Sequence, residues 1–455
     1  MLVLPILVMG ATAKNDPLCF RAQGEAKELN MLDGQTVRYT AYTGIRYVTN
    51  VEDSAVQTLN FFVPEGATQR SPILLRTYVG GYRESKAKMP SALDATGRAL
   101  QEGLCVCIPG SRGNDSATEN GQGQMVFTGK APYGLADLKA VVRYLRYNDK
   151  RMMGSAERII TDGTSAGGAM SALLGATANH PDYEPLLTQM GAAKAKDNVF
   201  AAVCYCPITD LDHADMAYEW LYQNQRKDVE AARKTGGQYE RYFNELKLRN
   251  PKTGELLTSE NYMEYMKSWL TASANRFVAE GGEIDDSLGF GFATYYPPTP
   301  PYRPGGPRYV RAKPIKSGIA TDVDLDQYLS YVVSRQALKE VPAFDNLKSP
   351  ECRLFGDTQD IPAHFTGNDA SEDLRHRVRM MNPMYYISDP KAQTAPHWYI
   401  RHGALDRDTS FPVAINLATK LMNEGREVDF ALPWNRSHEG DYNLDDLFRW
   451  IRDLY

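Results

Sequence analysis

Long apolar segments, a charge excess of one sign and abundant cysteine are all missing from this 455-residue sequence. The 51 basic and 56 acidic residues leave a net charge of −5, so nothing indicates a basic surface for a nucleic acid. After the N-terminus, no stretch has the roughly 18 consecutive apolar residues that a membrane-spanning helix needs. Hydrophobic residues make up 43% of the chain. The composition therefore predicts a soluble globular protein.

The N-terminus does carry one apolar run. Residues 1–13, MLVLPILVMGATA, end in Ala-Thr-Ala just before the polar KND. A run of this kind is typical of the hydrophobic part and cleavage site of a secretory signal. We therefore expect export to the periplasm or the extracellular space. A buried N-terminal strand is the alternative interpretation.

Cysteines are few, and four of the six form two C-x-C pairs. Because side chains of a strand alternate between its faces, Cys105 and Cys107 are expected on one face, as are Cys204 and Cys206. No further cysteine or histidine lies near either pair at the spacing of a metal site. We expect these thiols to be small buried side chains.

Two acidic clusters resemble calcium loops only superficially. The second lacks the glycine and the glutamate that an EF-hand needs, and solvated loops and helix N-caps are the expected roles for both. The clusters are DLDHAD, with Asp210, Asp212 and Asp215, and DVDLD, with Asp322, Asp324 and Asp326.

Short apolar runs alternate with helical patterns in the first half of the chain. ERIITDG and VFAAVCYCPITD have the composition of buried strands, and in the segment YGLADLKAVVRYLRYND apolar residues recur at helical spacing. Strands that alternate with helices predict a mostly parallel sheet with helices on both faces.

This alternation stops near residue 208 and resumes near residue 396. Charged helical patterns and the stretch TYYPPTPPYRPGGPRY lie between these points, and the strand-like segments HWYIRHG and EVDFALPW follow. We therefore expect one core, made of residues 14–207 and 396–455. Residues 208–395 would then be a large insertion between two late strands.

Three glycines surround one serine in TDGTSAGGAM, residues 161–170. Gly163 and Gly167 flank Ser165 in the pattern G-x-S-x-G, which lets a strand and a helix approach closely while the serine stays exposed on a strained turn. The pattern alone is weak in a chain with 36 glycines, and an ordinary strand-to-helix turn is the alternative. Its place between an apolar strand and an Ala/Leu-rich helix favours a nucleophilic serine.

A nucleophilic serine needs a base, and the base needs an acid that orients it. In the α/β-hydrolase fold the chain order is serine, acid, histidine, and the histidine follows the last strand. His438 lies in a polar loop directly after VDFALPW, and IRHGALDRDTS offers Asp406 and Asp408 after the preceding strand. The order favours Asp406 as the acid; a solvated loop carboxylate is the alternative.

An oxyanion hole would complete this set. It needs the backbone N–H that follows the nucleophile, which belongs to Ala166, and a second N–H from the loop after an earlier strand. TYVGGYRES supplies Gly80, Gly81 and Tyr82 at such a place. A plain tight turn is the alternative for these three residues.

Several long segments resemble bacterial tannases, the tannin acyl hydrolases of the α/β-hydrolase superfamily. The resemblance covers most of the chain from about residue 40 onward and rests on DGTSAGGAMSALLGATANHPDYEPLL, PITDLDHADMAYEW, and HWYIRHGALDRDTSF through VDFALPWNRSHEGDY. It implies a serine esterase that hydrolyses galloyl esters of tannins and alkyl gallates and releases gallic acid. It also implies a lid over residues 208–395, a triad of Ser165, Asp406 and His438, and no metal or organic cofactor.

The resemblance further implies three residues that bind the phenolic hydroxyls of the galloyl ring. They are Asp408, two residues after the triad acid, and Lys339 and Glu351 in KEVPAFDNLKSPECRLFG. Carboxylates accept hydrogen bonds from such hydroxyls, and an ammonium group donates to their oxygens. A surface charge pair is the alternative for Lys339 and Glu351.

Two other functions stay open at this point. A feruloyl or general aromatic carboxylesterase would keep the triad and alter the residues that bind the ring. A non-catalytic binding protein on a hydrolase scaffold would usually lose a triad member, whereas this sequence has candidates for all three.

Overall fold

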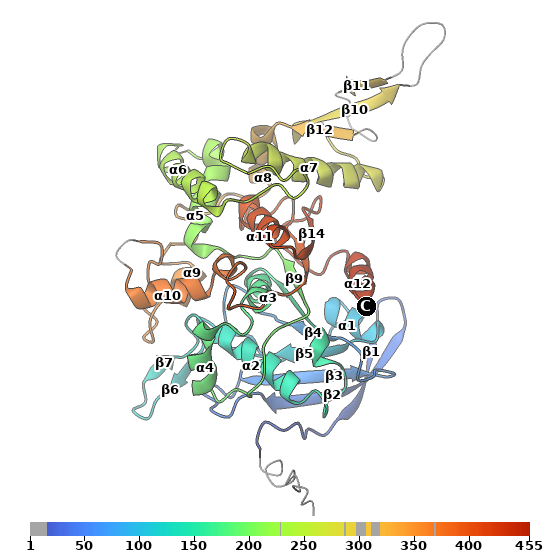
Figure 1. Cartoon of the computed structure of the whole chain (residues 1–455), viewed down its shortest axis with the longest axis vertical. Coiled ribbons are helices and arrows are strands. Elements are labelled where there is room, and N and C mark those ends of the chain that lie inside the picture. Colours follow the sequence, from blue (N-terminus) through green and yellow to red (C-terminus); the bar gives the residue numbers. More distant parts are fainter. Residues whose placement is uncertain (1–15, 228, 286–287, 297–305, 311–318, 368–369) are drawn as a thin grey trace, which may run out of the picture.

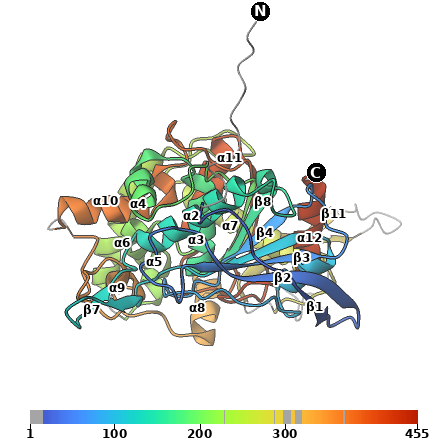
Figure 2. The same cartoon turned by 90° about the horizontal axis from the view of Figure 1, so that it is seen from below.

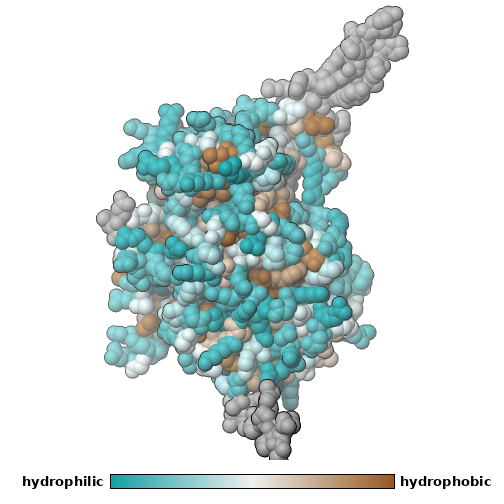
Figure 3. Space-filling view, in the orientation of Figure 1, coloured by the Kyte–Doolittle hydropathy of each residue, from teal (hydrophilic) through white to brown (hydrophobic). Residues whose placement is uncertain are grey.

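The computed structural model describes residues 16–227, 229–285, 288–296, 306–310, 319–367 and 370–455. The predicted signal segment, residues 1–13, lies outside these ranges. Over the ranges described, no helix combines the length and apolar character that crossing a membrane requires. Figure 3 shows one face of the molecule, where hydrophilic residues predominate and hydrophobic ones form small groups.

One large sheet organises the described part of the chain (Figure 1). Six of its strands, β5, β4, β8, β9, β13 and β14, run parallel to one another. At one edge β1, β2 and β3 are added in antiparallel pairing. In spatial order the strands are β1 (Glu25–Asn30), β2 (Thr36–Arg46), β3 (Thr58–Pro64), β5 (Cys105–Pro109), β4 (Ile73–Arg76), β8 (Ile159–Thr164), β9 (Ala201–Tyr205), β13 (His397–Arg401) and β14 (Glu427–Ala431).

Helices cover both faces of this sheet, as the alternation in the sequence predicted. One face packs against α2 (Tyr133–Tyr147), α3 (Ala166–Ala176) and α11 (Phe411–Asn423), and the other against α1 (Ala95–Gln101) and α12 (Leu444–Asp453). Parallel strands covered on both sides are apolar throughout, and every residue of β4, β5 and β9 is buried. Figure 2 shows β1, β2 and β3 at one side of the molecule with α12 beside them.

Side chains of β5 point alternately to the two faces of the sheet. Cys105 and Cys107 pack on the face of α2, whereas Val106 packs on the face of α1. The prediction of a shared face is therefore confirmed for this pair. The second pair differs, because β9 ends at Tyr205 and Cys206 follows it with φ 43°. All six cysteines are buried and free.

A long segment, which we call the insert, connects the neighbouring strands β9 and β13. It lies above the sheet in Figure 1, beyond the ends of the parallel strands. Its elements are α5 (Leu211–Tyr222), α6 (Val229–Leu246), α7 (Tyr262–Ala279), α8 (Leu325–Arg335), α9 (Pro350–Leu354) and α10 (Glu372–Met380), with a small sheet of β10 (Phe290–Tyr296), β11 (Gly306–Val310) and β12 (Ile319–Val323). Before the insert, the chain also forms β6 (Ala117–Glu119), β7 (Met125–Phe127) and α4 (Glu184–Gln189).

Buried tyrosines fasten the insert to the core. The hydroxyl of Tyr262 on α7 donates to Asn416 Oδ1 on α11 (2.8 Å), and the hydroxyl of Tyr328 on α8 donates to the carbonyl of Ala404 (2.5 Å). Burying a tyrosine contributes apolar area and leaves its hydroxyl in need of a partner. These bonds satisfy that need and fix α7 against α11 and α8 against the loop that follows β13.

Candidate active site

The serine of the GTSAG motif occupies a strained turn between β8 and α3. Ser165 has φ 62° and ψ −127°, a conformation that residues with a side chain rarely adopt. Its amide donates to the carbonyl of Tyr205 at the end of the neighbouring strand (2.9 Å). The turn therefore holds the serine at the C-terminal end of β8, where α3 begins.

Glycines are required around this turn because backbone segments approach closely. A Cβ atom on Gly163 would lie 2.2 Å from the carbonyl oxygen of Gly167, and one on Gly168 would lie 2.5 Å from that of Tyr205. Glycine alone tolerates such an approach. Close packing of β8, α3 and β9 thus explains the glycine pattern.

The loops after β13 and β14 carry Asp406 and His438, and their backbones are tied together. The amide of Leu405 donates to the carbonyl of Arg436 (2.8 Å). A Cβ atom on Gly403 would lie 2.3 Å from the same carbonyl oxygen. Because the two loops are bonded and in close contact, the acid and the histidine keep a fixed relative position.

Ser165, His438 and Asp406 form one hydrogen-bonded chain. His438 Nε2 lies 2.7 Å from Ser165 Oγ, and His438 Nδ1 lies 2.8 Å from Asp406 Oδ2. Asp406 is fully buried, and its Oδ1 accepts a hydrogen bond from the amide of Asp408 (2.8 Å). An imidazole held between a carboxylate and a hydroxyl has the geometry of a base that activates a nucleophile.

Burial and charge act in opposite directions on these groups. Burial alone would raise the pKa of Asp406, but His402 and His438 outweigh it and hold the pKa at about 2. Burial would likewise lower the pKa of His438, but the hydrogen bond and charge of Asp406 leave it above the usual value. Asp406 is therefore ionised at neutral pH and stabilises the protonated form of His438.

A second histidine lies beside the acid, and no pattern in the sequence distinguished it. His402 Nδ1 is 3.7 Å from Asp406 Oδ2, and the ring is fully buried. Neither ring nitrogen has a hydrogen-bond partner within the described ranges. Burial lowers the pKa of His402, so its ring is neutral at neutral pH and leaves His438 as the charged partner of Asp406.

Backbone amides lie next to the serine. Ala166 is the first residue of α3, where amides have no partner within the helix. Gly81 lines the cavity that contains Ser165 and has φ 55°, and Tyr82 has φ 56°. The buried Tyr82 hydroxyl donates to a carbonyl at the start of the insert (2.6 Å). Gly80 lines a second cavity, which also includes Gly81 in its lining.

A cavity of about 390 Å³ contains Ser165 and His438, and residues of the insert form its other wall. Lys339, Glu351 and Asp408 line it as well. The structure therefore brings the serine and the histidine into one cavity with all three residues that the resemblance assigned to ring binding. Two of those residues come from the insert and one from the loop after β13.

Helix α5 holds the segment that carries Lys339 and Glu351. The amide of Lys339 donates to the hydroxyl of Tyr218 (3.3 Å). The carboxylate of Asp215 accepts hydrogen bonds from the amides of Phe344 (2.8 Å) and Asp345 (2.9 Å). The segment PITDLDHADMAYEW thus supplies the side chains that support this cavity wall.

Glu351 is buried and Lys339 is partly buried. Burial lowers the pKa of Lys339 and raises the pKa of Glu351, while the charge of each opposes the shift of the other. Glu351 is 3% exposed, and Lys339 Nζ lies 4.1 Å from the centre of the Phe344 ring. Desolvated polar groups favour ligands that satisfy them and reject ligands that do not.

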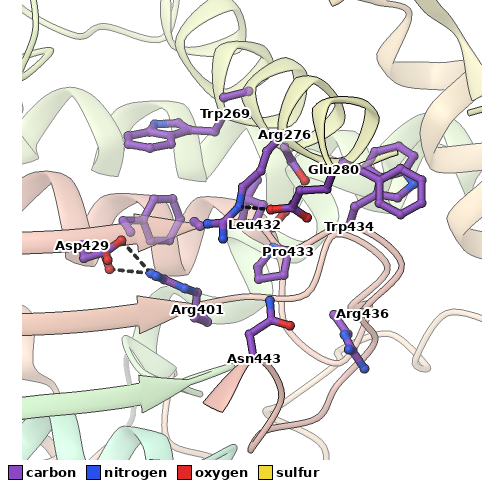
Figure 4. Close-up of a pocket in the computed structure, with 15 residues that line it drawn as sticks. Trp269, Arg276, Glu280, Arg401, Asp429, Leu432, Pro433, Trp434, Arg436 and Asn443 are labelled. Carbon is purple, nitrogen blue, oxygen red and sulfur yellow. Dashed lines mark hydrogen bonds and ion pairs between the residues drawn. The ribbon is translucent and has the colours of Figure 1, made fainter. Parts of the chain in front are cut away.

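Another cavity, of about 380 Å³, lies between α7 and the loop that follows β14 (Figure 4). None of the predicted site residues lines it. Arg401 pairs with Asp429 (3.0 Å) and Arg276 with Glu280 (2.8 Å), as the dashed lines show. Because these charges are already compensated, we place the candidate site in the cavity of Ser165.

The acidic cluster at the start of α5 is a hydrogen-bonded network: Asp210 stands at the N-cap position of α5, as expected for a helix N-cap, but it is buried and not solvated. His213 Nδ1 lies 2.8 Å from Asp210 Oδ1, and Asn382 Nδ2 donates to both Asp210 Oδ1 and Asp212 Oδ1 (2.7 Å each). In the second cluster Asp324 caps the N-terminus of α8, as expected.

Comparisons with known proteins agree with this fold. The BD-FAE family model matches residues 59–253. No curated protein sequence matches the chain. Among solved structures, the tannase of Fusobacterium nucleatum is 33% identical with a TM-score of 0.82, and the match covers 96% of this chain and 99% of that one.

The tannase of Lactobacillus plantarum is 35% identical with a TM-score of 0.83, and the match covers 96% of this chain and 98% of that one. A tannin acyl hydrolase solved in complex with ethyl gallate has the same identity and coverage with a TM-score of 0.81. This likeness extends over the core and the insert alike. The chain belongs to the tannase family of α/β-hydrolases and is a carboxylic ester hydrolase.

Proposed function

We propose that this enzyme hydrolyses galloyl esters of tannins and alkyl gallates and releases gallic acid. One observation carries the proposal: a single cavity holds Ser165, bonded to His438, together with Lys339, Glu351 and Asp408. The similar structures include tannin acyl hydrolases in complex with ethyl gallate and with 3,4-dihydroxybenzoate. Both of those ligands carry adjacent hydroxyls on an aromatic ring.

In the first step, Ser165 Oγ attacks the ester carbonyl carbon while His438 Nε2 takes the hydroxyl proton. The carbonyl oxygen becomes an oxyanion, which accepts hydrogen bonds from the amide of Ala166 and from an amide of the loop Gly80–Tyr82. The intermediate collapses when the bond to the alcohol oxygen breaks and His438 gives its proton to that oxygen. The products are a free alcohol and a galloyl ester of Ser165.

In the second step, water attacks the acyl carbon while His438 takes one of its protons. The bond to Ser165 Oγ then breaks, the proton returns to Oγ, and gallic acid is released. Asp406 keeps His438 in the tautomer whose Nε2 accepts a proton, and it stabilises the imidazolium in both steps.

The ring binds between the insert and the core in this proposal. Glu351 and Asp408 accept hydrogen bonds from the phenolic hydroxyls, and Lys339 donates to a phenolic oxygen. An ester without these hydroxyls leaves the buried Glu351 without a hydrogen-bond donor from the ring and is hydrolysed slowly. Residues 208–395 act as a lid because their segment 339–351 supplies most of the residues that line the cavity of Ser165.

Hydrolysis of methyl gallate by the purified protein tests this proposal. We expect gallic acid and methanol in equal amounts, measured by chromatography, and a loss of roughly 10⁴-fold or more in kcat for Ser165→Ala. A fluorophosphonate probe should label the wild type and leave Ser165→Ala unlabelled.

Ser171→Ala is the matched control for both measurements. Ser171 is a buried serine on the same helix, and its hydroxyl lies 2.7 Å from that of Thr161. This variant should keep both labelling and turnover. Labelling that survives in Ser165→Ala would contradict the assigned nucleophile.

A further inference from the structure

A second cavity, of about 430 Å³, adjoins the cavity of Ser165. Gly81, Lys348, Ser349 and Pro350 line both, so the two cavities lie side by side. We call the second the basic cavity, because its lining side chains include three cationic groups and no carboxylate. No step of the proposed reaction places a substrate group in this cavity.

Two of the three cations are free to bind a ligand. Arg353 is already paired with Asp360, with Nη2 2.6 Å from Oδ2. Arg83 and Lys348 are exposed, and neither forms an ion pair with any residue that the structure describes. The arginines in Figure 4 that pair with carboxylates show the contrasting case. An unpaired guanidinium and ammonium favour an anion, and the guanidinium can bind a carboxylate through two parallel hydrogen bonds.

The boundary between the two cavities is fixed by a buried amide. Asn114 is 1% exposed, and its Nδ2 donates to the carbonyls of Gly81 (2.9 Å) and Pro350 (3.0 Å). A Cβ atom on Gly81 would lie 3.8 Å from the Cβ of Pro350. The loop beside Ser165 and the segment that leads to Glu351 therefore meet at a defined place.

The direction of the ester decides what reaches the basic cavity. The carbonyl carbon bears the ring on one side and the alcohol oxygen on another, so the two groups extend in different directions. If Lys339, Glu351 and Asp408 hold the ring, the alcohol portion extends away from them. The basic cavity shares Gly81 and Pro350 with the cavity of Ser165, so it is an adjoining space that the alcohol portion can enter.

We propose that the basic cavity binds the alcohol portion of the substrate and selects galloyl esters whose alcohol carries a carboxylate. Arg83 and Lys348 bind that carboxylate, and Asn114 keeps the wall between the two cavities in place. This inference rests on the proposed function and adds to it a preference for the leaving group. Because the interaction exists before and during the reaction, it lowers KM more than it raises kcat.

Two substrates of equal size, one charged and one neutral, test the inference. Carboxymethyl gallate and carbamoylmethyl gallate have the same number of non-hydrogen atoms, and the first carries a carboxylate where the second carries an amide. We expect kcat/KM of the wild type to be about fivefold higher for the carboxylate at low ionic strength, since two exposed ion pairs contribute little each. Added salt should reduce this ratio toward one, because exposed charges are screened.

Three variants assign the effect to the basic cavity. The double variant Arg83→Met with Lys348→Met should bring the carboxylate-to-amide ratio close to one. Lys348→Glu should bring the ratio below one, because like charges repel. Lys86→Met is the matched control: Lys86 is an exposed neighbouring cation that lines neither cavity, and its loss should leave the ratio at the wild-type value.

The outcomes separate the inference from the proposed function. Equal kcat/KM for the two substrates in the wild type overturns the leaving-group preference and leaves galloyl ester hydrolysis intact. A preference that survives in the double variant also overturns it, since other residues would then supply the charge. Failure to hydrolyse both substrates and methyl gallate overturns the proposed function itself.

Discussion

Ser165 and His438 stand 273 positions apart in the sequence, and their side chains meet at 2.7 Å between Oγ and Nε2. The turn after β8 fixes the position of the serine, and the loop after β14 fixes the position of the histidine. Residues that hold these two places therefore affect activity even where they never touch a substrate.

The orienting role of Asp406 predicts a large kinetic effect for Asp406→Asn. The amide favours the wrong tautomer of His438, so kcat on methyl gallate should fall by roughly 10⁴-fold with little change in KM. Circular dichroism should show an unchanged fold. A variant that keeps more than about a tenth of the wild-type kcat would contradict the assignment.

The same carboxylate sets the pH dependence. Asp406 raises the pKa of His438, and a protonated imidazole cannot accept the serine proton. In the wild type kcat/KM should therefore fall as the pH drops through this raised pKa. In Asp406→Asn the raising effect is absent, so the residual activity should persist to lower pH. A profile measured from about pH 5 to about pH 9 checks this, and an acid limb that moves to higher pH would refute it.

A buried ion pair supports the histidine loop from the core. Arg76 on β4 lies 2.6 Å from Asp162 on β8 and 2.5 Å from Asp441, three residues after His438. Arg76→Met leaves two carboxylates without their cation and should lower the free energy of unfolding by about 3 kcal/mol. Urea titration measures this change.

Arg38→Met is the control for that experiment. Arg38 pairs with Glu28 on the surface, where the two side chains are 68% and 61% exposed. Its loss should change the free energy of unfolding by less than about 0.5 kcal/mol. Equal effects of Arg38→Met and Arg76→Met would show that burial of the Arg76 pair contributes nothing.

The tight turn between β8 and α3 predicts a contrast between two glycine-to-alanine variants. Gly163→Ala places a Cβ atom 2.2 Å from the carbonyl oxygen of Gly167, so the variant should lose activity and much of its stability. Gly237 lies in α6 with nothing within 4 Å of a Cβ atom, and Gly237→Ala should be neutral or stabilising by up to about 1 kcal/mol. Thermal unfolding of both variants, together with their methyl gallate activity, checks the contrast. An active Gly163→Ala with wild-type stability would be inconsistent with the packing described.

The charge of Glu351 predicts a substrate-dependent effect. Glu351→Gln keeps the shape of the side chain, so kcat/KM should fall about tenfold for methyl gallate and change little for methyl benzoate. Glu340 lines the same cavity from an exposed position, so Glu340→Gln should have a small effect on both esters. Equal losses on both esters in Glu351→Gln would indicate a structural role.

Much of the core was predictable because its signals are local. An apolar strand, a glycine-flanked serine and an Ala/Leu-rich helix follow one another around Ser165, and the parallel order of the strands brings the loops of Asp406 and His438 to the same edge. The antiparallel strands β1 and β2 were not predicted, since they are short of buried residues and mix polar with apolar positions.

The insert was predictable in position and not in form. The break near residue 208 located it between β9 and β13, yet nothing in the spacing of Lys339 and Glu351 indicated that both face the cavity of Ser165. That placement depends on long-range contacts, such as the bonds of Asp215 to the backbone of the insert. Arg83 and Lys348 carry no local pattern at all, because their only common feature is the cavity that they line.

One measurement tests the central claim that the cavity recognises a ring with adjacent hydroxyls. It is kcat/KM for methyl gallate, methyl 3,4-dihydroxybenzoate, methyl ferulate and methyl benzoate, determined for the wild type and for Asp408→Ala. We expect a fall of roughly 100-fold or more from the gallate to the benzoate in the wild type, and a much flatter series in Asp408→Ala. A flat series in the wild type, or a preference for methyl ferulate, would contradict the claim and identify a feruloyl or general aromatic esterase.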